Sequence, residues 1–332
     1  MLDIAVLIPC HNEAATIGKV VRDFRSALPS AEIYVYDNLS DDETAVRAEG
    51  AGANVHHEPY KGKGNVVRRM FADIDADVYV LVDGDDTYEA EDAPRLVRTL
   101  VERRLDLVNG KRMPVRAEAF RRGHRFGNRL LTAAVCGIFG SRFSDMLSGY
   151  KVLSRRFVKS FPALASGFEI ETELVVHALE LRMQVAEVEV SYRDRPQGSI
   201  SKLSTGRDGV RILQTIVGLV REERPLLTFS LVFATLASTS LLLGWPIVVD
   251  FFATGLVPRL PTAVLATGLM LLAFLALTCG LVLDTVTVGR RELKRLYYLQ
   301  ITPKWQAVLP VRSIADGGPV RRAHTENPER VA

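Results

Sequence analysis

The sequence is poor in cysteine and carries no large excess of charge of either sign. Its three cysteines, Cys10, Cys136 and Cys279, lie far apart in a chain of 332 residues, and no Cys-x-x-Cys pair is present. This spacing argues against a disulfide framework and against a zinc site. A formal net charge of +3 is too small to indicate a nucleic-acid partner, so none is expected.

The amino terminus also lacks a basic region, and its first apolar run, at residues 4–8, is too short for a signal peptide. We therefore expect this end of the chain to lie in the cytosol. Self-similarity with a period of roughly 20 to 50 residues is absent as well, so a solenoid or propeller is not expected.

Two long segments contain no charged residue, although 24% of the chain is charged. They cover residues 226–249 and 261–283, and each exceeds the roughly 20 residues that cross a hydrocarbon core. Neither has a polar face, which favours two membrane-spanning helices over two buried helices of a soluble domain. Flanking basic residues predict that both ends of the pair face the cytoplasm. These residues are Arg221, Arg224, Arg290, Arg291, Lys294 and Arg295.

Short apolar runs alternate with helical spacing over about the first 110 residues. Strands are expected at 4–8, 32–36, 54–57, 78–82 and 106–109. Helices are expected at 13–28, 65–74 and 93–103, with another after residue 42. This alternation predicts an α/β fold with a mostly parallel, Rossmann-like sheet covered on both faces. Further elements are expected as helices at 121–138 and 169–181 and as strands at 148–153 and 186–192.

The strand at 78–82 ends in Asp83-Gly84-Asp85. Ligands bind at the carboxyl ends of the strands in an open α/β sheet, and period-two alternation places Asp83 and Asp85 on one side, with Gly84 leaving the space between them open. Carboxylate oxygens suit Mg²⁺ or Mn²⁺ in a site shared with substrate phosphates. We therefore expect Asp83 and Asp85 to hold a divalent cation beside a nucleoside diphosphate. A polar turn with a helix cap is the alternative.

The turn Lys61-Gly62-Lys63-Gly64 combines positive charge with glycines that let the backbone approach an anion, just before a predicted helix. This pattern is typical of a phosphate-binding turn, although a solvated loop has the same composition. Asp37, at the end of the second strand, has two explanations as well. It can accept hydrogen bonds from a ribose or a base, or it can cap the next helix.

Four motifs, in this order, resemble the nucleotide-sugar-binding half of family-2 glycosyltransferases of the GT-A fold. They are Pro9-Cys10-His11-Asn12-Glu13, Asp37-Asn38-x-Ser40-x-Asp42-x-Thr44, Lys61-Gly62-Lys63-Gly64 and Asp83-Gly84-Asp85. Two later motifs, at residues 145–150 and 192–203, are similar to the acceptor side of polyprenyl-phosphate glycosyltransferases, the group that contains dolichol-phosphate mannose synthase.

The resemblance implies roles for individual residues. Pro9, Glu13 and Asp37 would line the nucleoside. Lys63, with Gly64 and Gly84, would complete the nucleotide-sugar site, and Asp83 and Asp85 would hold the metal.

On the acceptor side, Arg112, Arg195 and Lys202 would hold a phosphate, although arginines at strand ends are commonly just exposed charges. A lipid phosphate is already ionised at neutral pH and needs cations, whereas a hydroxyl acceptor needs a base. Asp145 is the first candidate for such a base, and Glu169 or Glu171 is the second. Other polar residues on the helix at 169–181 are typical of a solvated face. They are Glu173, His177 and Glu180.

These observations lead to one hypothesis. The chain is an inverting glycosyltransferase that uses Mg²⁺ or Mn²⁺ and moves a sugar from a UDP- or GDP-sugar to polyprenyl phosphate at the cytoplasmic face of a membrane. The alternatives are a transferase acting on a lipid hydroxyl such as a diacylglycerol, and a non-catalytic membrane scaffold. The membrane helices offer a surface for a homo-oligomer.

The expected organisation of the chain has four parts. A catalytic domain at 1–204 precedes an amphipathic juxtamembrane helix at 205–225, a two-helix hairpin at 226–288 and a cytoplasmic, partly disordered tail at 289–332.

Overall fold

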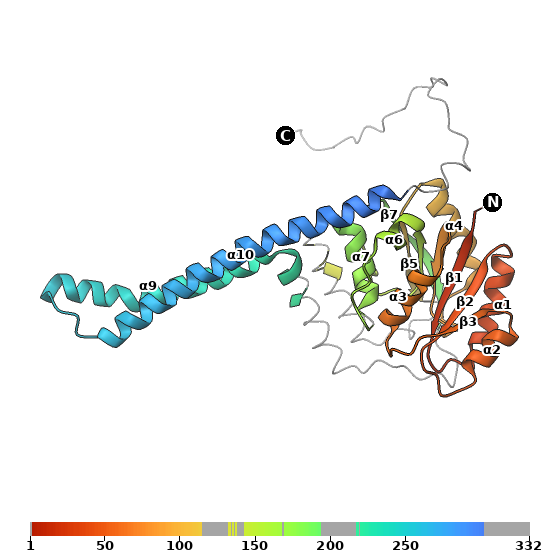
Figure 1. Cartoon of the computed structure of the whole chain (residues 1–332), viewed down its shortest axis with the longest axis horizontal. Coiled ribbons are helices and arrows are strands. Elements are labelled where there is room, and N and C mark those ends of the chain that lie inside the picture. Colours follow the sequence, from red (N-terminus) through yellow and green to blue (C-terminus); the bar gives the residue numbers. More distant parts are fainter. Residues whose placement is uncertain are drawn as a thin grey trace, which may run out of the picture.

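The computed structural model describes residues 2–114, 132–133, 135, 137, 143–167, 169–193, 217–218 and 220–301. Arg195, Lys202 and the tail from residue 302 lie outside the described residues, as do most of the helix expected at 121–138 and most of the juxtamembrane segment. An α/β unit lies at one end of a long helical hairpin (Figure 1).

Seven strands form one mixed sheet in the order β3-β2-β1-β4-β6-β5-β7. Their bounds are β1 (Ile4–Cys10), β2 (Glu32–Asp37), β3 (Asn54–His57), β4 (Val78–Leu81), β5 (Leu107–Pro114), β6 (Lys151–Ser154) and β7 (Val185–Tyr192). β6 runs antiparallel to both of its neighbours, β4 and β5, whereas the other neighbouring pairs are parallel. The predicted α/β fold with a mostly parallel sheet is confirmed, and β4 is its middle strand.

Helices cover both faces of this sheet. They are α1 (Ile17–Ala27), α2 (Thr44–Gly50), α3 (Lys63–Asp73), the short 3-10 helix η1 (Ala90–Asp92), α4 (Ala93–Glu102), α6 (Arg155–Ser160) and α7 (Ile170–Glu180). The side chains of β4 alternate between two hydrophobic cores. Val78 and Val80 pack in the core that includes α1 and α4, whereas Tyr79 and Leu81 pack in the core that includes α3, α6 and α7. Burial on both faces fixes the register of β4, and with it the place where Asp83 leaves the sheet.

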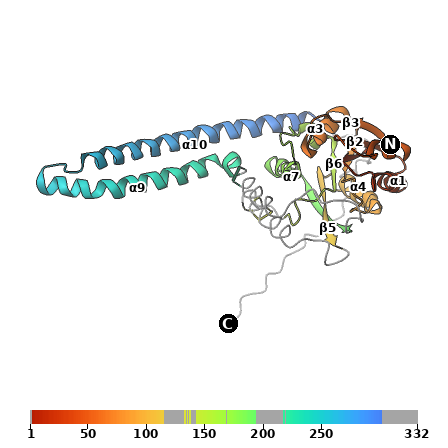
Figure 2. The same cartoon turned by 90° about the horizontal axis from the view of Figure 1, so that it is seen from below.

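Two long helices, α9 (Pro225–Thr254) and α10 (Leu260–Gln300), lie side by side and project from the α/β unit (Figures 1 and 2). α9 ends at Gly255, whose φ of 70° is the left-handed conformation that glycine adopts without strain. Only 6% and 17% of the residues in their most apolar windows are buried, so neither is the core helix of a soluble domain. Their length, composition and exposure indicate association with a membrane.

α10 continues beyond its apolar part and lies against the α/β unit (Figure 1). The Lys294 ammonium lies 2.6 Å from the carboxylate of Glu180 on α7, whose side chain is only 1% exposed. One turn later, the Tyr298 hydroxyl donates to the buried Asp106 at 2.9 Å, and the Arg156 guanidinium lies 4.8 Å above the Tyr298 ring. The boundary expected at residue 289, between the hairpin and the cytoplasmic tail, falls within this continuous helix.

The solvated face predicted for α7 is wrong. His177 is buried among Phe157 and Phe161, and burial lowers its pKa to about 3. The Glu173 carboxylate accepts from the backbone amides of residues 164 and 165. Part of this face of α7 is buried by α10, which lies more than a hundred residues later in the chain. The helical spacing of α7 alone therefore did not indicate the burial.

Lys294→Met is expected to lower the free energy of unfolding by roughly 2–3 kcal/mol, because it leaves the buried Glu180 carboxylate without its closest partner. The cost lies at the low end for a buried pair because Arg291 remains 3.7 Å from the same carboxylate. Urea unfolding of the full chain in detergent measures the change. Arg295→Met, at an exposed position on the same helix, is the matched control. Equal midpoints for the two variants would contradict the prediction.

Candidate functional site

The carboxyl ends of β1 and β2 and the turn before α3 meet at one edge of the sheet. Asp37, at the end of β2, pairs in register with Cys10 of β1. The side-chain amide of Asn38 donates to the carbonyls of Glu58 and Tyr60, and its oxygen accepts from the amide of Gly62 at 2.7 Å. Glu13 and Asp37 are buried, and Pro9 is half-buried. Three of the four amino-terminal motifs are thus neighbours in space.

Two glycines of the Lys61–Gly64 turn face another segment of backbone. A Cβ atom on Gly62 would lie 2.2 Å from the carbonyl oxygen of Ser166, and one on Gly64 would lie 2.2 Å from that of Ala165. The amide of Gly64 donates to the Ser166 carbonyl at 3.1 Å. These glycines are therefore required for the close approach of residues 165 and 166, a packing role that the sequence did not indicate.

Lys63, at the start of α3, lies between two carboxylates. Its ammonium is 2.5 Å from Oδ1 of Asp83 and 2.6 Å from Oε1 of Glu171 on α7. Burial opposes the charge on Lys63, but the two carboxylates outweigh burial, so its pKa is raised. Sequence reasoning proposed Glu171 only as a second-choice base. Its separation of 108 residues from Lys63 left no local signal for the ion pair.

Asp83 and Asp85 differ in their surroundings. The Asp83 side chain is 28% exposed, whereas Asp85 is buried and accepts from the Thr87 hydroxyl at 2.7 Å. Gly84 packs closely against β1, because a Cβ there would lie 2.6 Å from the sulfur of Cys10.

The described residues contain no group of three or more His, Cys, Asp or Glu side chains that could hold a metal ion. Two carboxylates completed by substrate phosphates are nevertheless a common Mg²⁺ arrangement. The Lys63 ammonium on Asp83 shows that a positive charge fits at this carboxylate, so Asp83 suits a divalent cation.

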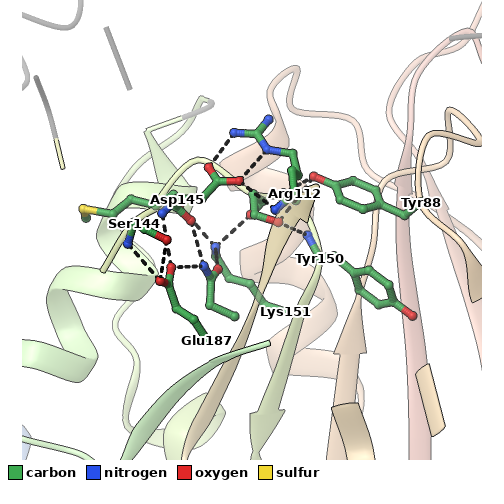
Figure 3. A network of polar contacts seen from close by, with 11 residues as sticks. Tyr88, Arg112, Ser144, Asp145, Tyr150, Lys151 and Glu187 are labelled. Atoms are coloured by element: carbon green, nitrogen blue, oxygen red, sulfur yellow. Dashed lines mark hydrogen bonds and ion pairs between the residues drawn. The ribbon is translucent and has the colours of Figure 1, made fainter. Parts of the chain in front are cut away.

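Arg112, on β5, binds Asp145 through two parallel hydrogen bonds (Figure 3). Nε and a terminal nitrogen each donate to a different oxygen of Asp145 at 2.7 Å, and the Arg112 amide donates to the same carboxylate at 3.1 Å. Burial alone would raise the pKa of Asp145, but the guanidinium outweighs burial and lowers it. Arg112 also lies 5.5 Å from the ring centre of Tyr192.

Lys151, the first residue of β6, is fully buried beneath this pair (Figure 3). Its ammonium donates to Asn109 and to the carbonyls of Met146 and Ser148, at distances between 2.7 and 3.2 Å. Burial lowers its pKa to about 8. Because its acceptors lie on both sides of residue 147, Lys151 fixes the shape of the segment that carries Asp145. Nothing in the sequence separates this lysine from an ordinary strand residue.

Gly149 joins this segment to the acidic residues after β4. A Cβ on Gly149 would lie 2.1 Å from Oδ2 of Asp83, and its amide donates to the hydroxyl of the buried Tyr88 at 2.8 Å. The structure therefore brings Asp83 and Lys63 into one region with the segment that holds Asp145 and Arg112. Glu169 is half-buried at the amino-terminal cap of α7, two residues before Glu171.

Comparisons with known proteins agree with this architecture. Residues 5–158 match the family described as Glycosyl transferase family 2. The chain is 32% identical to glycosyltransferase AglJ of Haloferax volcanii, over 90% of this chain and 98% of that protein. It is 30% identical to a dolichyl-phosphate hexose transferase of the same organism, over 67% of this chain and 96% of that protein.

Among solved structures, the chain resembles glucosyl-3-phosphoglycerate synthase from Mycobacterium tuberculosis in complex with Mn²⁺, UDP-glucose and phosphoglyceric acid. The TM-score is 0.54 and the identity 26%, covering 65% of this chain and 80% of that one. The fold and the acidic edge of the sheet thus define a GT-A glycosyltransferase. The chain belongs to glycosyltransferase family 2.

Proposed function

We propose that this glycosyltransferase uses a divalent cation to transfer one sugar, with inversion, from a UDP- or GDP-sugar to the phosphate of a polyprenyl lipid at the cytoplasmic face of a membrane. The observation that carries the proposal is the contact of Gly149 with Asp83, because it joins the acidic donor side to the segment that carries Asp145, the partner of Arg112. The exposed hairpin of α9 and α10 supports a lipid acceptor, and its flanking basic residues support the cytoplasmic orientation.

On the donor side, Asp83 and Asp85 hold Mg²⁺ or Mn²⁺. A cation held there would supply Lewis-acid stabilisation of the negative charge on the departing diphosphate. Lys63 supplies a second positive charge next to Asp83. Pro9, Glu13 and Asp37 line the nucleoside. Gly64 and Gly84 let the chain pack closely beside Lys63 and Asp83 and so complete the nucleotide-sugar site. The Mn²⁺ and UDP-glucose named for the structural neighbour support this donor chemistry.

On the acceptor side, Arg112 holds the lipid phosphate, together with Arg195 and Lys202. The second pKa of a phosphate monoester is near 6, so its oxygen is already ionised at neutral pH and needs no strong base. Asp145 suits this arrangement, because both of its oxygens accept from Arg112 and its pKa is lowered, which makes it a weak base and a good support for the guanidinium. The name of the dolichyl-phosphate hexose transferase relative also supports a phosphate acceptor.

Transfer to a lipid hydroxyl is the second candidate, since the structural neighbour is a glucosyl-3-phosphoglycerate synthase rather than a lipid-phosphate enzyme. A base is then required, and the candidates are Asp145 and, second, Glu169, which is half-buried at the start of α7.

The purified chain in detergent, given labelled nucleotide sugars, Mn²⁺ and either polyprenyl phosphate or diacylglycerol, tests both candidates. We expect label only in the polyprenyl lipid, in a product that mild acid cleaves because the sugar is joined through a phosphodiester. An acid-stable product on diacylglycerol would favour the second candidate. Unlabelled lipid across a broad panel of sugars would contradict both.

A further inference from the structure

Three charged groups from distant parts of the chain meet at the donor side. Lys63 comes from the start of α3, Asp83 from the end of β4 and Glu171 from the first turn of α7. The side chains of Lys63 and Glu171 are only 9% and 11% exposed. Because little water reaches them, the interactions among these charges are stronger than those of a surface ion pair.

The proposed function creates a conflict at Asp83. A divalent cation binds carboxylate oxygens directly, yet the Lys63 ammonium already lies 2.5 Å from Oδ1 of Asp83. Two cations at the same oxygen repel each other, so the ammonium has to move away when the metal ion binds. A buried ammonium that lost every partner would be strongly destabilised.

Glu171 resolves this conflict, because it gives Lys63 a second carboxylate at 2.6 Å. The backbones that carry Lys63 and Glu171 are held together by packing. Gly62 and Gly64 contact the carbonyls of Ser166 and Ala165, a few residues before α7. This packing keeps the backbone at Lys63 close to the segment that leads into α7, so Glu171 stays within reach of the Lys63 ammonium.

Resting on the proposed function, we propose that Glu171 is a positioning residue that retains Lys63 when a divalent cation binds Asp83. It keeps one positive charge beside the metal without letting that charge compete for the metal's ligand. The role differs from that of a base, which would contact the acceptor, and from that of a simple negative charge, which would attract the metal whether or not Lys63 were present.

The test measures Mn²⁺ binding to the full chain in detergent by electron paramagnetic resonance of the free ion, with and without UDP and with no acceptor. Four proteins form the cycle: wild type, Lys63→Met, Glu171→Gln and the double variant. We expect Glu171→Gln to weaken Mn²⁺ binding roughly tenfold in the wild-type background and less than about twofold in the Lys63→Met background. Glu102→Gln, at an exposed position, controls for net charge.

Glu171→Asp distinguishes the effect of the negative charge at residue 171 from the effect of the length of its side chain. It keeps the negative charge but shortens the side chain by one methylene, so it is expected to weaken Mn²⁺ binding nearly as much as Glu171→Gln. Wild-type affinity in Glu171→Asp, or equal effects of Glu171→Gln in both backgrounds, would overturn the proposal. Because Mn²⁺ binding is measured without lipid, this test is independent of glycolipid formation. A dependence of the Glu171→Gln effect on Lys63 supports the role of Glu171 even if no glycolipid is made. Its absence contradicts that role even if glycolipid is made. A wild type that binds no Mn²⁺ in either condition would overturn both the metal site and the role of Glu171.

Discussion

Asp85→Asn is expected to reduce sugar transfer by about 10²- to 10³-fold, because it removes one charge from the pair of carboxylates that we propose as metal ligands. The substitution keeps the shape of the side chain, and asparagine can still accept from the Thr87 hydroxyl, which lies 2.7 Å from Asp85. The turn should therefore remain folded. Initial rates of glycolipid formation at increasing Mn²⁺ measure the effect, and we expect excess Mn²⁺ to restore only part of the activity.

Asp86→Asn is the matched control for this prediction. Asp86 is the next residue, pairs with Lys19 at 2.7 Å and has a φ of 57°, which asparagine tolerates. Loss of this pair should change turnover less than about threefold, because a pair with a well-exposed partner contributes little. Equal losses in both variants would indicate a general disturbance of the turn, and near-normal turnover in Asp85→Asn would remove it from the metal site.

The fold could be predicted from the sequence wherever the signal is local. β4 is the clearest case, because the five apolar residues at 78–82 are followed directly by acidic residues, and the structure places this strand in the middle of the sheet. Local features of the sequence also indicated Asp83 and Lys63, whereas Arg112 and the motif that holds Asp145 were indicated by the resemblance to polyprenyl-phosphate glycosyltransferases. The long helices α9 and α10 also follow from uninterrupted apolar composition.

The remaining features depend on contacts between distant segments. Lys151 is buried because residues 144–148 fold over it, and no periodicity in β6 separates it from an exposed lysine. Glu180 is buried because α10 returns to the α/β unit. Glycines were also ambiguous, since Gly62 and Gly64 suit an anion-binding turn as well as the close packing that the structure shows.

Arg112→Lys is expected to reduce transfer to polyprenyl phosphate by about 10²-fold, mainly through a higher KM for the lipid. Lysine keeps the positive charge but cannot make the two parallel hydrogen bonds that join Arg112 to Asp145. The freed Asp145 carboxylate would then compete with the acceptor phosphate for the remaining charge. Steady-state kinetics with varied lipid at saturating nucleotide sugar measure the change. Lys111→Met, at a half-buried neighbouring position paired with Glu189, should leave both constants unchanged.

Asp145→Asn decides between the two roles of this carboxylate. If Asp145 positions Arg112, Asp145→Asn should resemble Arg112→Lys, and the double variant should be hardly worse than either, because both changes remove the same interaction. If Asp145 is a general base, Asp145→Asn should instead lower kcat with little change in the KM for the lipid.

The pH profile of activity is an independent test of the role of Asp145. The pKa of Asp145 is lowered from 3.8, so this group is ionised throughout the neutral range and should produce no loss of activity between about pH 6 and 8. A fall in kcat through that range that disappears in Asp145→Asn would assign it the role of a base and would favour a hydroxyl acceptor.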